Sequence, residues 1–254
     1  MIEIIQIPVL SDNYTYLIID KKSKVSGCID PSVFEDVQKV LEERNITLNF
    51  ILNTHHHSDH VGGNIELKKQ HGCKIIGNFF DQDRIPGIDI KLRENDIFKI
   101  GESAFTVIET SGHTVGHICF YFKKQKILFS GDTVFSLGCG RIFEGTYEQM
   151  TNSILKIRSL PKQTKIYCGH EYTESNANFV KYLNPNDSLL KNKISDIKRK
   201  RSESLPTIPC LLEEEMKLNP FFRFDDREYL ESINLENMSM VENFKKIRIM
   251  KDEF

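Results

Sequence analysis

The chain has 254 residues, 34 of them Lys or Arg and 36 Asp or Glu, which gives a net charge of −2. A charge so near balance offers no general attraction to nucleic acid or to acidic lipid, so we expect neither as a partner. No run of about 18 apolar residues is present, which argues against a membrane span. The length is sufficient to bury a substantial core.

Short β-rich segments dominate the chain up to residue 172. Between them lie helical patterns, and beyond residue 172 the pattern becomes helical, with prolines separating the segments. We therefore expect two domains, 1–172 and 173–254. The predicted strands are 2–8, 13–20, 25–30, 48–54, 73–77, 105–110, 117–122, 127–131 and 164–168. The predicted helices are 33–44, 61–71, 147–158, 173–183, 187–203, 209–217 and 236–250.

The amino terminus alternates like a strand and has no basic leader, so we expect no signal or transit peptide. Six cysteines are scattered along the chain and form no C-x-x-C pair. Such a distribution is typical of buried thiols in a reducing compartment. The sequence therefore predicts a cytoplasmic protein.

The most informative segment follows the apolar run 50–52 directly. It reads Thr-His-His-His-Ser-Asp-His at 54–60, and His55, His57, Asp59 and His60 have the spacing H-x-H-x-D-H. Imidazoles at alternate positions leaving a strand end point the same way, and the next turn lets the Asp and the last His face a second point. The spacing predicts two metals instead of one.

Three further residues are candidates for the same centre, and each follows a predicted strand. They are His113, Asp132 and His170, and each has a glycine beside it. Small residues allow close approach of the backbone to a site, and loops at strand ends are where open sheets assemble their chemistry. We expect these strand ends to converge.

The other histidines have ordinary interpretations. Strand alternation turns His56 away from its neighbours, so we expect a packing or supporting role. His117 opens an apolar strand and is predicted to be a satisfied core histidine, with a hydrogen bond to a ligand as the alternative. His71 lies at a predicted helix C-terminus, where imidazole complements the helix dipole.

Six segments together resemble the metallo-β-lactamase superfamily and, in their details, the glyoxalase II (hydroxyacylglutathione hydrolase) family. They span nearly the whole chain, and the resemblance implies an αββα sandwich followed by a helical C-terminal domain. In chain order they are NYTYLI (13–18), THHHSDHVGGN (54–64), GHTVGHI (112–118), FSGDTVFSLGCGR (129–141), YCGHEYT (167–173) and NPFFR (219–223).

The resemblance also implies a ligand set. One metal would be held by His55, His57 and His113, the other by Asp59, His60 and His170, with Asp132 bridging the two. Asp59 and Asp132 are thus the catalytic carboxylates, as ligands and not as an acid and base pair, because nearby cations hold them ionised. Zinc is the expected metal, and iron or manganese suits the same ligands.

A family of this kind predicts hydrolysis of glutathione thioesters, chiefly S-D-lactoylglutathione to D-lactate and glutathione, in methylglyoxal detoxification. The nucleophile would be a hydroxide bridging the two metals, with no protein general base. A thiolate leaves readily, so the lack of an obvious general acid agrees with a thioester. We expect a monomer or a weak oligomer.

Substrate binding requires cations and donors for the two carboxylates of glutathione. By resemblance the candidates are Arg141, Phe143, Tyr172, Arg248 and Lys251. Many members of the family have Lys and Tyr where Arg141 and Phe143 stand. The Arg keeps the charge with a different geometry, whereas the Phe lacks a hydroxyl, which puts the contribution of Phe143 in doubt.

Four alternatives use a similar motif. A persulfide dioxygenase shares the first histidine cluster but resembles a chain without the long helical C-terminal region. A β-lactamase usually carries a secretory leader, and a metal-dependent ribonuclease would be expected to have a basic arm. A noncatalytic metal-binding scaffold is the fourth, and seven intact ligands argue against it.

Overall fold

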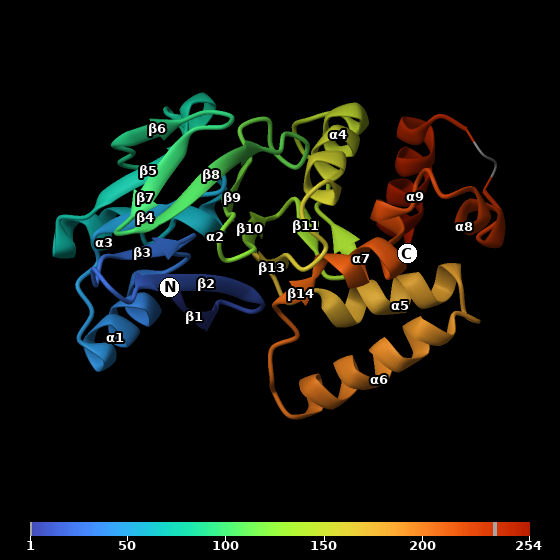
Figure 1. The fold of residues 1–254 in the computed structure, drawn as a ribbon, viewed down its shortest axis with the longest axis horizontal. Helices are drawn as coiled ribbons and strands as arrows, with labels where there is room; N and C mark the ends of the chain where they lie inside the picture. Colours follow the sequence, from blue (N-terminus) through green and yellow to red (C-terminus); the bar gives the residue numbers. More distant parts are fainter. Residues whose placement is uncertain (1, 236–237) are drawn as a thin grey trace. The chain divides into compact units, whose positions relative to one another are not determined.

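The computed structural model describes residues 2–235 and 238–254 (Figure 1). The chain divides into two compact units. The first unit contains the residues up to 109 together with 115–131, and the second contains 110–114 together with the residues from 132 onward.

The first unit contains one complete sheet and four strands of a second. Its elements are β1 (Ile2–Val9), β2 (Asn13–Asp20), β3 (Ser26–Ile29), α1 (Phe34–Arg44), β4 (Phe50–Leu52), α2 (Ser58–Val61), α3 (Asn64–His71), β5 (Lys74–Asn78), the 3-10 helix η1 (Phe79–Asp81), β6 (Ile90–Leu92), β7 (Ile97–Ile100), β8 (Ser103–Glu109), β9 (Ile118–Phe122) and β10 (Ile127–Gly131).

The first sheet has the order β1-β2-β3-β4-β5-β6, and its strands β3 to β6 are parallel. Cys28 pairs with Ile51, and Ile51 pairs with Ile75, so the carboxyl ends of β3, β4 and β5 meet at one edge. This edge carries Asp30 and the segment 53–60, because each follows its strand directly.

Apolar side chains hold the layers of this unit together. Helices α1 and α3 contribute Val37, Leu41 and Leu67 to a buried cluster that also contains Ile51 and Ile75 of the first sheet. A different set of contacts joins the two sheets: the ring of Tyr16 in β2 lies 5.4 Å from that of Phe129 in β10. The strands β7 to β10 follow one another as antiparallel neighbours. The expected arrangement of two sheets with outer helices is confirmed.

The second unit is mainly helical, as expected for the carboxyl-terminal part of the chain. Its elements are β11 (Val134–Phe135), β12 (Gly138–Cys139), α4 (Tyr147–Arg158), β13 (Lys165–Cys168), α5 (Thr173–Leu183), α6 (Ser188–Ser202), β14 (Cys210–Leu211), α7 (Leu212–Leu218), the 3-10 helix η2 (Pro220–Phe222), α8 (Arg227–Ser232) and α9 (Met240–Glu253).

Local sequence explains where two of these helices begin. Thr146 and Gln149 form a capping box at the start of α4, and Ser239 and Glu242 form another at the start of α9. Helices α5 and α6 lie side by side (Figure 1) and bury Ala177, Leu190 and Ile197 in one cluster.

Several predicted bounds were wrong. The pattern at 61–71 predicted one helix, but α2 and α3 are separated at Gly62–Gly63, where a Cβ would meet backbone of the 31–33 segment at 2.3–3.1 Å. The predicted helix 209–217 begins instead with strand β14, which pairs with β13. The last helix begins at Met240, and residues 236 and 237 of that prediction lie outside the described residues. Short elements were missed because they contain too few residues for a period to appear: β6, β7, β11, β12, β14 and α8.

Candidate metal centre and substrate cations

The turn after β4 positions the first four predicted ligands. The strand ends at Leu52 and α2 begins at Ser58, so strand alternation does not orient His55 and His57, contrary to expectation. The irregular turn instead brings His55 Nε2 within 3.0 Å of His57 Nδ1. The first turn of α2 then places His60 Nε2 3.4 Å from Asp59 Oδ2.

Asp30 supports this turn, and the sequence reasoning missed it. Its carboxylate accepts from the backbone N–H and the hydroxyl of Thr54 at 2.8 and 2.7 Å. Its Oδ2 also lies 3.1 Å from His60 Nδ1, while Thr54 Oγ1 lies 3.0 Å from His55 Nδ1. A hydrogen bond at one ring nitrogen fixes the tautomer and leaves the other nitrogen for a metal. The position of Asp30 at the end of a parallel strand beside β4 was the available signal.

The three histidines that were not predicted to be ligands contact other side chains. His56 Nδ1 lies 3.2 Å from Oδ2 of Asp81, a fully buried residue. Gly116 makes room for this carboxylate, because a Cβ there would lie 2.0 Å from Asp81 Oδ1. His117 is fully buried, and its ring stacks on that of His55 with centroids 4.9 Å apart. His71 ends α3 and lies 2.7 Å from Gln38 Oε1.

The other three predicted ligands, His113, Asp132 and His170, lie together in the second unit. Asp132 Oδ2 lies 3.5 Å from His113 Nε2 and 3.2 Å from His170 Nε2. The other ring nitrogen of His113 lies 2.8 Å from the carbonyl oxygen of Arg141. All three ligand candidates are buried. If Nδ1 of His113 donates to the Arg141 carbonyl oxygen, its Nε2, on the side of Asp132, becomes the ligand atom.

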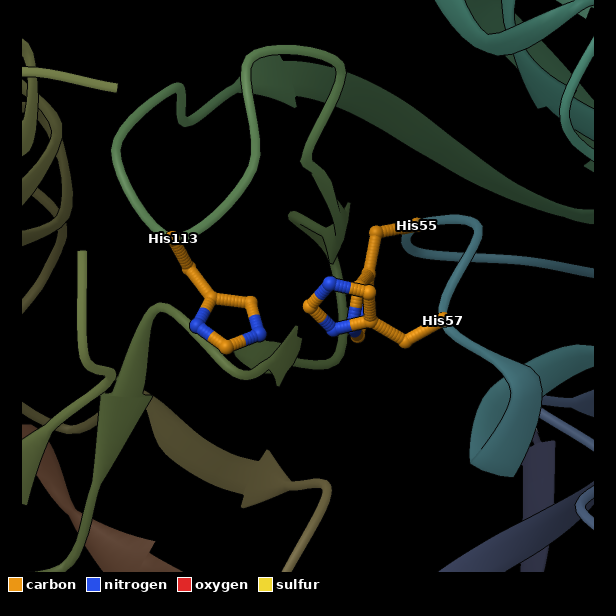
Figure 2. A group of neighbouring side chains, drawn as sticks. All are labelled: His55, His57 and His113. Atoms are coloured by element: carbon orange, nitrogen blue, oxygen red, sulfur yellow. The ribbon is translucent and has the colours of Figure 1, made fainter. Parts of the chain in front are cut away.

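Three groups of these side chains could each hold a metal ion. They are His55, His57 and His113, then His55, His60 and Asp132, and finally Asp59, His60 and His170, with one ligand atom per residue and all atoms of a group within 4.8 Å of one another. Figure 2 shows the rings of the first group turned toward one another. His56, His71 and His117 belong to none of these groups.

The donor set fits a divalent ion. Ligand atoms about 2.0–2.2 Å from one tetrahedral ion lie roughly 3.3–3.6 Å from each other. The separations of 3.4 Å at Asp59–His60 and 3.5 Å at Asp132–His113 fall in this range. Imidazole and carboxylate are ligands that such ions accept, so the cluster implies divalent metal ions.

Two of the predicted substrate residues lie beside ligand candidates. The ring of Tyr172 stacks on that of His170, with centroids 4.6 Å apart and planes 5° from parallel. The ring of Phe143 meets that of His113 edge to face at 5.2 Å and is 63% exposed. Both aromatic rings therefore have exposed surface next to a predicted ligand.

The three predicted cations gather near the end of α9. Arg248 is only 4% exposed, and its Nη1 donates to the carbonyl oxygen of Cys139 at 2.9 Å. Its Nη2 lies 2.9 Å from Asp252 Oδ1, and Arg141 Nε lies 3.8 Å from the same oxygen. Burial, and then the charges of Arg248 and Arg141, lower the pKa of Lys251. Asp252 is a further member of this group that the sequence reasoning did not single out.

The cysteines near the predicted site are structural. All six cysteines are free and buried, as expected. Burial raises the pKa of the Cys139 thiol to about 11 and that of Cys168 still further. A thiol with a raised pKa is a poor nucleophile at neutral pH, which agrees with metal-dependent chemistry.

Comparisons with known proteins agree with this fold. Residues 11–170 match the family model of the metallo-beta-lactamase superfamily, and residues 171–254 match that of the hydroxyacylglutathione hydrolase C-terminus. Two solved structures share the fold. The B3 metallo-beta-lactamase BLEG-1 has a TM-score of 0.66 and 23% identity, covering 87% of this chain and 99% of its own. ETHE1 from Myxococcus xanthus has a TM-score of 0.68 and 23% identity, covering 96% and 95%.

Curated relatives define the family more narrowly. The hydroxyacylglutathione hydrolase of Methylococcus capsulatus is 43% identical over 254 residues, covering 100% of this chain and 99% of its own. That of Pelagibacter ubique is 49% identical over 245 residues, covering 96% and 97%. The chain therefore belongs to the hydroxyacylglutathione hydrolase family of the metallo-β-lactamase superfamily, and the resemblance stated from the motifs is confirmed.

In the part of the chain that the structure describes, the helices are too short or too polar for any of them to cross a membrane.

Proposed function

We propose that the protein hydrolyses glutathione thioesters, chiefly S-D-lactoylglutathione to D-lactate and glutathione, and so acts in methylglyoxal detoxification. The observation that carries the proposal is the set of three His and Asp groups, which includes all seven predicted ligands. The full-length similarity to relatives named hydroxyacylglutathione hydrolase supports the choice of substrate.

The proposal includes two divalent ions. Zinc is the expected metal, and iron or manganese are alternatives. His55, His57 and His113 would hold one ion, and Asp59, His60 and His170 the other, with Asp132 shared. The bound ions would supply an activated water as nucleophile near neutral pH and an electrophile for the thioester carbonyl. Burial of His55, His60, His113 and His170 supports this assignment, because a dry site strengthens ligation and excludes competing water.

The protein's own groups would fix the ligands and the substrate. Asp30 and the Arg141 carbonyl would hold the imidazoles of His60 and His113 in the tautomer that makes Nε2 the ligand atom. A thiolate leaving group needs little protonation, so no general acid is required for the second half of the reaction. Asp59 and Asp132 act as ligands in this scheme.

Residues 173–254 would form the substrate-binding domain. Arg248, Lys251 and Arg141 form a cluster of three cations with one carboxylate, Asp252. Such a cluster suits the carboxylates of glutathione. Tyr172 and Phe143 would line the approach to the ligands, since both rings are partly exposed beside them.

The test is a comparison of substrates on one purified sample. We expect rapid hydrolysis of S-D-lactoylglutathione and slow hydrolysis of a simple thioester that lacks the glutathione carboxylates. KM for the glutathione thioester should rise with ionic strength while kcat stays nearly flat, because salt screens the capture of an anion more than chemistry inside the site. Equal turnover of both substrates across the salt series would contradict glutathione recognition.

The same sample also tests the alternative activity. A persulfide dioxygenase would consume oxygen and release sulfite from glutathione persulfide. Sulfite production without thioester turnover would replace the proposed reaction by that one.

We also propose that the protein works as a monomer or weak oligomer in the cytoplasm. Six free, buried thiols support a reducing compartment. Sedimentation would measure the oligomeric state, and fractionation of cells would measure the location.

A further inference from the structure

A buried carboxylate in α7 takes no part in the predicted site. Glu213, Glu214 and Glu215 follow one another, and the first two pair with Lys217 and Lys193. Glu215 is 0% exposed and its carboxylate accepts three hydrogen bonds. The donors are Leu137 N–H at 2.7 Å, the Ser136 hydroxyl at 3.1 Å and the Asn219 amide at 2.9 Å. Burying a carboxylate is costly, so these bonds indicate a specific role.

Two of these bonds reach one tight turn, and Asn219 bonds to the same turn through other contacts. Ser136 and Leu137 join β11 to β12, and Leu137 has φ +58°, a left-handed conformation that a branched residue rarely adopts. The Asn219 amide also donates to the carbonyl oxygens of Gly138 at 3.0 Å and Phe135 at 3.4 Å. The Asn176 amide donates to the carbonyl oxygen of Ser136 at 3.0 Å. Three buried polar side chains thus bond to all four residues from 135 to 138.

Each strand of the ribbon formed by β11 and β12 leads to a residue of the candidate site. Asp132 lies two residues before the start of β11, and the ring of Phe135 meets that of His170 edge to face at 5.9 Å. At the other end, the carbonyl oxygen of Cys139 accepts from Arg248 Nη1 at 2.9 Å. A shift of the turn would therefore move Asp132, a predicted metal ligand, and Arg248, a cation predicted to bind the substrate.

We propose that Glu215 is a positioning residue that fixes the Ser136–Leu137 turn and thereby sets the places of Asp132 and Arg248 together. It touches neither substrate nor metal and acts through the ribbon. The inference about Arg248 rests on the proposed function, whereas the inference about Asp132 concerns metal binding alone.

Two substitutions separate the hydrogen bonds from the charge. In Glu215→Gln the amide oxygen can accept from Leu137 and Asn219, since both donate to Oε2, and the amide N–H can donate to the Ser136 hydroxyl. In Glu215→Leu the volume is similar, but the N–H of Leu137 loses its acceptor. The matched control is Glu213→Leu, because the side chain of this neighbour is 42% exposed and pairs with Lys217, whose side chain is 56% exposed.

Metal content, glutathione binding by calorimetry and kinetics should be measured on each variant. We expect Glu215→Leu to lose bound metal on dialysis and to raise KM by about tenfold, because the unsatisfied N–H of Leu137 would displace the turn that positions Asp132 and Arg248. Glu215→Gln and Glu213→Leu should stay within about twofold of the wild type in all three measurements.

A purely structural role would give a different result. If Glu215→Leu lowered only the melting temperature and kept metal content and KM, the proposal would be wrong. If that variant fails to fold, Asn176→Ala can replace it, because this substitution removes one bond to the same turn. Asn176→Ala should show the same changes more weakly. Unchanged metal content and KM in Asn176→Ala would overturn the proposal. A third result separates the two proposals. If Glu215→Leu lost metal but the wild type showed no thioester turnover, the proposed function would be refuted, and the role of Glu215 in positioning Asp132 would stand.

Discussion

Arg248 Nη2 lies 2.9 Å from Asp252 Oδ1, one helical turn further along α9. The guanidinium is nearly buried, yet its Nε has no hydrogen-bond partner among the described residues. An internal carboxylate thus occupies one donor of the cation that we assign to the substrate, and the unbonded Nε is itself buried from solvent. Asp252 and an anionic substrate would compete for the same positive charge.

Replacing that carboxylate tests the competition. Asp252→Asn should lower KM for S-D-lactoylglutathione by about twofold to fivefold, the range for a partly exposed ion pair. Inhibition by the product glutathione should strengthen in parallel. Glu253→Gln on the same helical turn is the control and should change neither constant. A higher KM for Asp252→Asn would mean that this residue mainly orients Arg248.

The metal assignment predicts stoichiometry. Purified protein should contain close to two divalent ions per chain, and chelation should abolish turnover, which added zinc should restore. Asp132→Ala should lower kcat by at least about 100-fold, because a shared ligand is lost, whereas the surface variant Asp36→Ala should not. Elemental analysis and kinetics on one sample decide the matter. One ion per chain with full activity would eliminate the two-metal scheme.

The cations of α9 should affect binding more than chemistry. Arg248→Ala and Lys251→Ala should each raise KM by about tenfold or more with a smaller change in kcat, since charge-assisted bonds to a remote carboxylate contribute about 1.5–3 kcal/mol. Lys245→Ala, on an exposed position of the same helix, is the control. Steady-state kinetics give both constants. Loss of kcat at unchanged KM would remove these residues from the binding site.

The lowered pKa of Lys251 predicts a pH dependence of binding. A lysine holds an anion only while protonated, so a lowered pKa moves the loss of charge to lower pH than the usual value near 10.4. KM should therefore rise with increasing pH before that value is reached. In Lys251→Arg the charge persists, and the rise should disappear. An identical alkaline rise in both proteins would trace it to another group.

The exposed ring of Phe143 predicts the effect of a hydroxyl. Phe143→Tyr should lower KM by about twofold to tenfold if the new group bonds the substrate, as one neutral hydrogen bond contributes about 0.5–1.5 kcal/mol. The melting temperature should not change, because the ring is 63% exposed. Phe143→Leu serves as a control for the ring itself. Identical KM values for Phe and Tyr would show that this position does not contact substrate.

The sequence alone was sufficient for the family and for much of the fold. Local patterns predicted long elements such as β1, β2, α1 and α4 to within a residue or two, because eight or more residues reveal a period or a cap. The H-x-H-x-D-H spacing identified metal chemistry, since few structural needs place four such residues within six positions.

Only the tertiary structure decided which side chains support these groups. Asp30 lies 30 residues from His60, and Glu215 lies 78 residues from Leu137, so no local spacing links either pair. Glu214 and Glu215 look alike in the sequence, yet the first is exposed and the second fully buried, because burial depends on which face of a seven-residue helix meets the ribbon. Contacts between distant residues have no local period, and they determine which charges are available for chemistry.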